Sequence, residues 1–155
     1  MIGKRILIVD DEATARMLIS EFIDDEKCVA LEAGSGRKAL EIIKKESPDL
    51  VLLDYKLPDI DGLEVLANIR SKNPTLPVIV FSAHGDVKSA VRALKLGAYD
   101  FLEKPLDANK LLVTMRNALW NIELEDEVTR LKQELGKQYR MVGSSEVMQE
   151  LRKRI

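Results

Sequence analysis

Acidic side chains follow two short hydrophobic segments of this 155-residue chain, at the point where each segment ends. Asp10 and Asp11 come directly after Arg5–Val9, and Asp54 comes directly after Leu50–Leu53. Carboxylates that lie close together repel one another, and a hard cation with oxygen ligands relieves that repulsion. Mg²⁺ suits such a site best, because it needs only one or two protein carboxylates and keeps several waters. The sequence therefore predicts a Mg²⁺ site where the two segments lie side by side.

An aspartate in such a place can also act as a nucleophile in phosphoryl transfer. The resulting acyl phosphate needs a metal ion, a lysine and a hydroxyl group to stabilise its charge. Lys104 and Ser82 each follow a later hydrophobic segment and supply that pair. Asp54 is the best nucleophile candidate because it stands alone, whereas the adjacent Asp10 and Asp11 suit metal binding. For any one of these acids a solvated loop residue is the more common explanation, but that explanation fits the whole set poorly.

Five short apolar segments recur along the chain, and each is followed by apolar residues at helical spacing. The segments are Arg5–Val9, Val29–Ala33, Leu50–Leu53, Pro77–Phe81 and Tyr99–Leu102. This alternation predicts an α/β fold with a mainly parallel sheet, helices on both faces and right-handed crossovers. Residues at the carboxyl ends of parallel strands share one edge of the sheet, so a strand order of 2-1-3-4-5 would bring the three aspartates together and place Ser82 and Lys104 beside them.

Composition excludes several classes of protein. The chain has 24 basic and 26 acidic side chains and a formal charge of −2, so no general field recruits nucleic acid or anionic lipid. No window approaches the roughly 20 apolar residues of a membrane span. Cys28 has no second cysteine with which to form a disulfide or a zinc site. We expect a soluble cytoplasmic protein with no membrane partner.

The C-terminal part has a different pattern. A four-three-four spacing of apolar residues among charged ones predicts a short coiled-coil linker over residues 123–140. The apolar positions are Leu124, Val128, Leu131 and Leu135. An amphipathic helix folded back on its own domain is the alternative. Gly136 is expected to end the helix. The predicted organisation is a compact domain over residues 1–122, the linker, and the start of a further domain over residues 141–155.

Several blocks of the chain resemble the signatures of the response-regulator receiver domain, over roughly residues 4 to 120. These blocks are Ile6–Glu12, Val51–Pro58, Phe81–His84 and Phe101–Pro105. The resemblance implies a flavodoxin-like, five-stranded parallel sheet of order 2-1-3-4-5. It also implies a two-component response regulator that is a phosphoacceptor rather than a conventional enzyme, with Asp54 accepting a phosphoryl group from a sensor histidine kinase.

The resemblance assigns metal ligands. It implies that Asp11 binds Mg²⁺ directly and that Asp10 binds partly through water. Asp54 and the main-chain carbonyl of Lys56 complete the protein ligands. No other cofactor is implied.

The resemblance also assigns residues to the phosphoryl group and to a conformational switch. Ser82 and Lys104 would hold the phosphoryl oxygens, and Phe101 would rotate inward on activation. His84 occupies a position at which family members tune dephosphorylation, although an exposed loop histidine is an equal alternative. Departures are mild: Ser82 replaces a frequent threonine, Leu57 a frequent methionine and Phe101 a frequent tyrosine.

The segment Val142–Leu151 resembles the junction with the AAA+ ATPase domain of NtrC-type activators of sigma-54 transcription. This likeness implies that the chain is the amino-terminal fragment of an ATPase. It also implies a homodimer formed through helix four, strand five and helix five, through the linker, or through both. The chain holds no Walker A loop and no helix-turn-helix candidate, so this fragment is expected to bind no nucleic acid.

Four other readings compete with this one. Gly34–Ala39 matches the G-x-G-x-x-A dinucleotide-binding fingerprint, which would suggest an oxidoreductase. Haloacid-dehalogenase phosphatases also use an aspartate nucleophile and Mg²⁺. Their typical motif is D-x-D after the first strand, whereas here Asp10 and Asp11 are adjacent. A stand-alone receiver could signal by protein contact alone. An interaction module with an inactive site is the last alternative.

Overall fold

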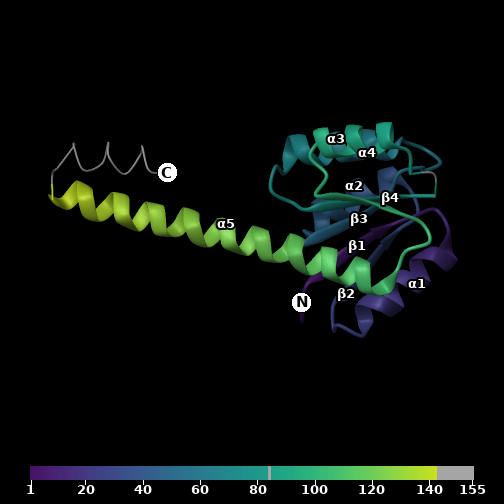
Figure 1. Ribbon diagram of the computed structural model, residues 1–155, viewed down its shortest axis with the longest axis horizontal. Coiled ribbons are helices and arrows are strands. Elements are labelled where there is room, and N and C mark those ends of the chain that lie inside the picture. Colours follow the sequence, from purple (N-terminus) through teal and green to yellow (C-terminus); the bar gives the residue numbers. More distant parts are fainter. Residues whose placement is uncertain (84, 143–155) are drawn as a thin grey trace. The chain divides into compact units, whose positions relative to one another are not determined.

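The computed structural model describes residues 1–83 and 85–142 of the chain. In that part, strands and helices alternate from the N-terminus onward (Figure 1). The elements are β1 (Arg5–Val9), α1 (Ala13–Asp24), β2 (Val29–Ala33), α2 (Gly36–Glu46), β3 (Leu50–Asp54), α3 (Gly62–Lys72), β4 (Val78–Ser82), α4 (Val87–Lys95), β5 (Asp100–Glu103) and α5 (Ala108–Val142). The strands pair in parallel in the order β2-β1-β3-β4-β5, which confirms the predicted fold class.

Two apolar layers enclose the sheet, because successive residues of a strand point to opposite faces. Leu7 and Val9 pack on the side of α2, α3 and α4, whereas Ile6 and Ile8 pack on the side of α1 and α5 (Figure 1). All five residues of β3 are buried. Helices thus cover the central strand on both faces, and Asp54 is its last residue.

The strand register brings the predicted site residues to one edge of the sheet. Val9 pairs with Leu53, so the residues that follow them, Asp10 and Asp54, come together where the adjacent strands β1 and β3 end. Ser82, the last residue of β4, pairs with Glu103 of β5, and Glu103 directly precedes Lys104. The convergence predicted from the strand order is confirmed.

Protein groups fill the N-terminus of α2, where the dinucleotide fingerprint falls. Asp59, from the loop after β3, accepts hydrogen bonds from the Gly36 N–H (2.9 Å) and the Arg37 N–H (3.0 Å). The Ser35 hydroxyl accepts the Lys38 N–H at 3.2 Å. These are the donors that a pyrophosphate would need. The motif therefore works as a helix cap, which contradicts the dinucleotide interpretation.

The glycine in that motif also has a packing role. A Cβ on Gly36 would lie 2.8 Å from Cγ2 of Val65, on α3. The absence of a side chain lets α2 approach α3, and close packing explains the glycine without a ligand.

Replacing Asp59 with asparagine is expected to destabilise the fold at neutral pH and to matter less in acid. Hydrogen bonds from the Arg37 and Gly36 N–H groups lower the pKa of Asp59. A lowered pKa in the folded state stabilises the fold above the unfolded-state pKa, and this contribution is lost as pH falls through the folded-state value. Urea denaturation should show a difference between wild type and Asp59→Asn that shrinks below about pH 4. The control is Glu41→Gln, which changes an exposed carboxylate on α2, the helix that Asp59 caps. A stability difference between wild type and Asp59→Asn that does not depend on pH would contradict the capping role.

The last helix is longer than the sequence predicted. Gly136 lies inside α5, so the expectation that it ends the helix is wrong. One glycine in a helix interior costs only about 1 kcal/mol relative to alanine, which neighbouring helix-forming residues offset. Residues 143–155, which hold most of the predicted AAA+ segment, lie outside the described residues.

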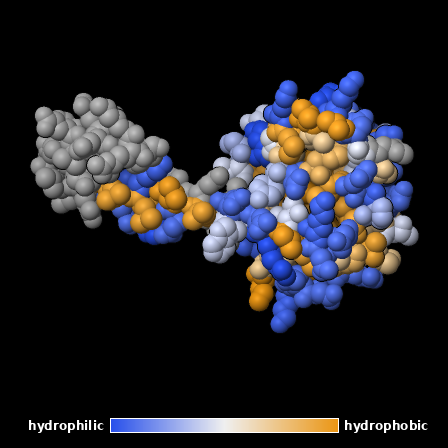
Figure 2. Space-filling view, viewed as in Figure 1, coloured by the Kyte–Doolittle hydropathy of each residue, from blue (hydrophilic) through white to orange (hydrophobic). Residues whose placement is uncertain are grey.

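The chain divides into a compact unit over Met1–Leu119 and a second unit from Trp120 onward. In the second unit the four apolar residues of the predicted coiled coil, which we call the seam, are Leu124, Val128, Leu131 and Leu135. They are 40–52% exposed, and apolar side chains line this part of α5 (Figure 2). This exposure leaves the seam available for a partner helix. Within the described residues, no helix is both long and apolar enough to cross a membrane.

Candidate functional site

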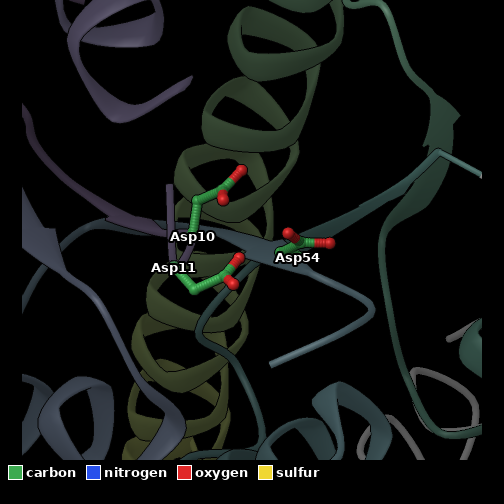
Figure 3. Close-up of side chains that lie close together, drawn as sticks. All are labelled: Asp10, Asp11 and Asp54. Atoms are coloured by element: carbon green, nitrogen blue, oxygen red, sulfur yellow. The ribbon is translucent and has the colours of Figure 1, made fainter. Parts of the chain in front are cut away.

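Three aspartates converge at the carboxyl ends of β1 and β3. Asp10, Asp11 and Asp54 each offer a carboxylate oxygen, and these oxygens lie within 4.8 Å of one another. Figure 3 shows the three side chains gathered at one place. Asp10 is fully buried and Asp54 is 5% exposed, whereas Asp11 is exposed. The cluster therefore has a buried floor and an open side toward solvent.

Lys104 bridges the two buried aspartates. Its Nζ lies 2.9 Å from Oδ2 of Asp10 and 3.2 Å from Oδ2 of Asp54. It also lies 5.2 Å from the centroid of the Phe81 ring, over the ring face. The main-chain N–H of Lys104 donates to the carbonyl of the buried Ser82 at 2.8 Å, so the predicted lysine and hydroxyl residues are neighbours.

The electrostatic balance of the cluster is negative. Burial raises the pKa of Asp54, the Lys104 ammonium lowers it, and the charge of Asp10 raises it again, so the net direction is upward. Burial lowers the pKa of Lys104, but hydrogen bonds and attraction from Asp10 and Asp54 outweigh that effect and raise it. One ammonium thus contacts two carboxylates of a cluster of three. A cation added at the open side would relieve the remaining repulsion.

Main-chain groups fix the orientation of both buried carboxylates. The Glu12 N–H donates to Oδ1 of Asp10 at 2.9 Å, and the Lys56 N–H donates to Oδ1 of Asp54 at 3.2 Å. Each aspartate therefore uses one oxygen for the turn that follows it and the other for Lys104. Hard oxygen donors on a rigid floor form the ligand set that Mg²⁺ prefers, so the residues present fit this ion.

Two residues that position the cluster were not predicted from the sequence. Nη1 of Arg16, on α1, donates to the carbonyl of Asp10 at 2.7 Å, and its Nε lies 3.2 Å from Oε1 of Glu32. A Cβ on Gly62 would lie 2.5 Å from the carbonyl oxygen of Asp54. In the sequence, an arginine on an amphipathic helix and a glycine after an aspartate carry no signal for these contacts.

Replacing Arg16 with alanine is expected to weaken Mg²⁺ binding by about tenfold. Arg16 holds the peptide that joins Asp10 to Asp11, and loss of a residue that orients metal ligands typically costs 10–100-fold in affinity. Calorimetric Mg²⁺ titration would measure the loss. Arg116→Ala, which removes an arginine paired with Glu26 away from the cluster, is the matched control. Equal affinities for Arg16→Ala and wild type would refute the positioning role.

The predicted switch residues lie in different surroundings. Phe101 is half-buried, and its ring meets that of Tyr55 edge-on, with centroids 6.3 Å apart and an interplanar angle of 79°. Both rings pack against the apolar layer on the side of α2, α3 and α4, and Tyr55 directly follows Asp54 in the chain. His84 lies outside the described residues.

Comparison with known proteins identifies this arrangement. Residues 6–116 match the family model described as the response regulator receiver domain. The chain is 43% identical over 149 residues to the nitrogen assimilation regulatory protein NtrX of Azorhizobium caulinodans, covering 95% of this chain and 33% of that protein.

Two solved structures are also similar. NtrX from Brucella abortus in complex with ADP has a TM-score of 0.79 and 39% identity, with 84% of this chain and 30% of that chain covered. The receiver domain of a putative LuxO repressor from Vibrio parahaemolyticus has a TM-score of 0.78 and 36% identity, with 82% and 98% covered. This chain spans about a third of the length of its curated relatives. These relatives are of the NtrC type that the sequence resemblance predicted, and the chain belongs to the response regulator receiver domain family.

Proposed function

We propose that Asp54 accepts a phosphoryl group from a phosphohistidine on a sensor histidine kinase. In this step a carboxylate oxygen of Asp54 forms a bond to phosphorus while the nitrogen–phosphorus bond of the donor breaks. The observation that carries the proposal is the bridging of Asp10 and Asp54 by Lys104, beside an open acidic cluster. Receiver domains share this chemistry, and none of its groups is missing from the described residues.

Mg²⁺ would be held by Asp10, Asp11, Asp54 and the main-chain carbonyl of Lys56. When bound, the ion neutralises charge on the phosphoryl oxygens. The protein's own contribution is rigid placement, because main-chain N–H groups already hold one oxygen of each buried aspartate.

Lys104 and Ser82 would bind the phosphoryl oxygens once Asp54 is modified. The phosphoryl group on Asp54 carries roughly two negative charges at pH 7, which gives the Lys104 ammonium a stronger partner than Asp10. Drawing Ser82 toward the same group would move the loop after β4, and Phe101 would then turn inward. The face made of α4, β5 and α5 would change, and α5 carries that change into the linker. His84 would modulate the lifetime of the phosphoryl group.

The regulated partner, in our proposal, is an AAA+ ATPase domain later in the same protein. The junction-like segment after α5 and the greater length of NtrX and LuxO relatives support this. The related NtrX structure contains ADP. The full-length protein would be an NtrC-type, cytoplasmic activator of sigma-54-dependent transcription, controlled through its receiver.

Replacing Leu131 with glutamate is expected to convert a linker-mediated dimer into a monomer. Leu131 is 45% exposed in the single chain and lies in the middle of the predicted seam, where a buried charge would be costly. Analytical ultracentrifugation at micromolar concentration would measure the change. The control is Lys132→Glu, which places the same acidic side chain at the next, exposed position outside the seam. This variant should leave the dimer intact. A wild-type chain that stays monomeric with and without a phosphoryl analogue would contradict the proposed dimer.

The phosphoacceptor role is tested by labelling with a radioactive phosphohistidine donor. Wild type is expected to take up one phosphoryl group in the presence of Mg²⁺ and none in EDTA, and Asp54→Asn is expected to take up none. A small phosphoester separates this role from that of a phosphatase. Rapid multiple turnover of the ester would favour a haloacid-dehalogenase mechanism and count against the receiver mechanism.

A further inference from the structure

The loop between β3 and α3 carries one of the proposed metal ligands. It spans residues 55–61 and contains the main-chain carbonyl of Lys56, which would bind Mg²⁺. At the start of the loop, the Lys56 N–H donates to Oδ1 of Asp54 at 3.2 Å. Beyond its end, the Gly62 N–H donates to the carbonyl of Tyr55 at 3.1 Å. The place of the Lys56 carbonyl therefore depends on how the residues between these two contacts are held.

Asp59, inside this loop, connects it to α2. One carboxylate oxygen accepts the Gly36 N–H at 2.9 Å and the other accepts the Arg37 N–H at 3.0 Å. The loop and the helix also approach closely there, since a Cβ on Gly36 would lie 3.2 Å from Cβ of Ile60. The side chain of Asp59 is exposed, so it acts through its two hydrogen bonds and not through apolar burial.

The segment between Asp59 and Lys56 is stiff. The ring of Pro58 fixes its φ at about −65°, and the residue before a proline, here Leu57, is restricted to extended conformations. Leu57 also packs against the apolar layer on the side of α2, α3 and α4. A displacement of Asp59 would therefore reach the Lys56 carbonyl, because the two residues between them have little freedom to absorb it.

We propose that Asp59 is a positioning residue for Mg²⁺, and that its attachment to the N-terminus of α2 holds the Lys56 carbonyl at the metal site. The inference rests on the proposed metal-binding role of that carbonyl. Such coupling is reciprocal, because an ion that favours one arrangement of the loop also favours the contacts made in that arrangement. Mg²⁺ should therefore strengthen the hydrogen bonds between Asp59 and α2.

Mg²⁺ titration of Asp59→Ala and Ser35→Ala tests this role. Each variant removes a hydrogen-bond acceptor from the N-terminus of α2, because the Ser35 hydroxyl accepts the Lys38 N–H at 3.2 Å, but only Asp59 belongs to the loop. Calorimetry should show about tenfold weaker Mg²⁺ binding for Asp59→Ala, the lower end of the range for residues that orient metal ligands. Ser35→Ala should bind Mg²⁺ as wild type does. Asp59→Asn keeps one oxygen acceptor and should lose less affinity than Asp59→Ala.

Two results of the titration would overturn the proposal. Wild-type affinity in Asp59→Ala would show that the loop keeps its place without this side chain. Equal losses in Asp59→Ala and Ser35→Ala would show that Mg²⁺ affinity follows the stability of α2 and not the attachment of the loop.

Amide hydrogen exchange, followed by NMR, measures the same coupling from the side of the helix. In wild type, saturating Mg²⁺ should slow exchange of the Gly36 and Arg37 N–H groups by up to about tenfold, the reciprocal of the change in affinity. This slowing should persist in Ser35→Ala, and its absence from wild type would overturn the proposal. If wild type binds no Mg²⁺, the proposed metal site fails. Exchange of the Lys56 N–H in EDTA then decides whether Asp59 holds the loop: it should be faster in Asp59→Ala than in Ser35→Ala, and equal rates would refute the positioning role.

Discussion

Replacing Lys104 with methionine is expected to lower the free energy of unfolding by roughly 2 kcal/mol in EDTA, and Mg²⁺ is expected to restore most of that loss. The side chain of Lys104 is 24% exposed and contacts Asp10 and Asp54, whose side chains are 0% and 8% exposed. Removing the ammonium that bridges these two acids leaves uncompensated buried charge. Partial exposure of the lysine reduces the cost below that of a fully buried pair.

The dependence on Mg²⁺ is the informative part of this prediction. A cation bound by the aspartates should interact more favourably with a site that has lost its ammonium, so Mg²⁺ should stabilise Lys104→Met more than wild type. Urea denaturation with EDTA or with saturating Mg²⁺ measures both quantities. Lys88→Met, an exposed lysine on α4, is the control and should show neither effect. Equal stabilisation of Lys104→Met and wild type by Mg²⁺ would contradict this electrostatic account.

Replacing Gly62 with alanine is expected to cost about 3 kcal/mol of stability and to weaken Mg²⁺ binding. The new Cβ would lie 2.5 Å from the carbonyl oxygen of Asp54 and 2.6 Å from that of Tyr55. Both are main-chain atoms that cannot turn aside as a flexible side chain can. Relief of the overlap must therefore shift the start of α3 or the end of β3, which carries Asp54.

Gly85 provides the matched control for this substitution. A Cβ there would meet Cγ of Glu103 at 3.2 Å, a side-chain atom that can move. Gly85→Ala should therefore change the midpoint of urea denaturation much less than Gly62→Ala, although both positions lie close to the site. Comparable small shifts for the two variants would show that the main chain around Asp54 yields more easily than its buried surroundings indicate.

The sequence predicts the place of the site well because that place depends on where the strands end and on the order in which they pair. Short apolar segments that alternate with helices of period 3.6 predict a parallel sheet, and the strand order that the receiver resemblance implies brings Asp10, Asp54 and Lys104 to one edge. The bounds of β1 and β2 agree with the prediction, and β3 extends by one residue to include Asp54.

Contacts between side chains and distant main-chain groups could not be predicted in the same way. Asp59 caps a helix whose first residue precedes it by 23 positions, and Arg16 binds the carbonyl of Asp10. Neither contact alters hydrophobic periodicity, which is the signal that sequence patterns carry. Gly136 shows that a local sequence signal can also mislead. A glycine often marks the end of a helix, but here it is tolerated because its neighbours favour the helix.

The most direct test of the central claim is to locate the phosphoryl group after reaction with a phosphodonor and Mg²⁺. Borohydride reduces an aspartyl phosphate to homoserine, which peptide mass spectrometry can assign to one position of the chain. We predict homoserine at position 54 alone, and none when EDTA replaces Mg²⁺. Modification at Asp10 or Asp11 instead of Asp54, or stable labelling without Mg²⁺, would contradict it.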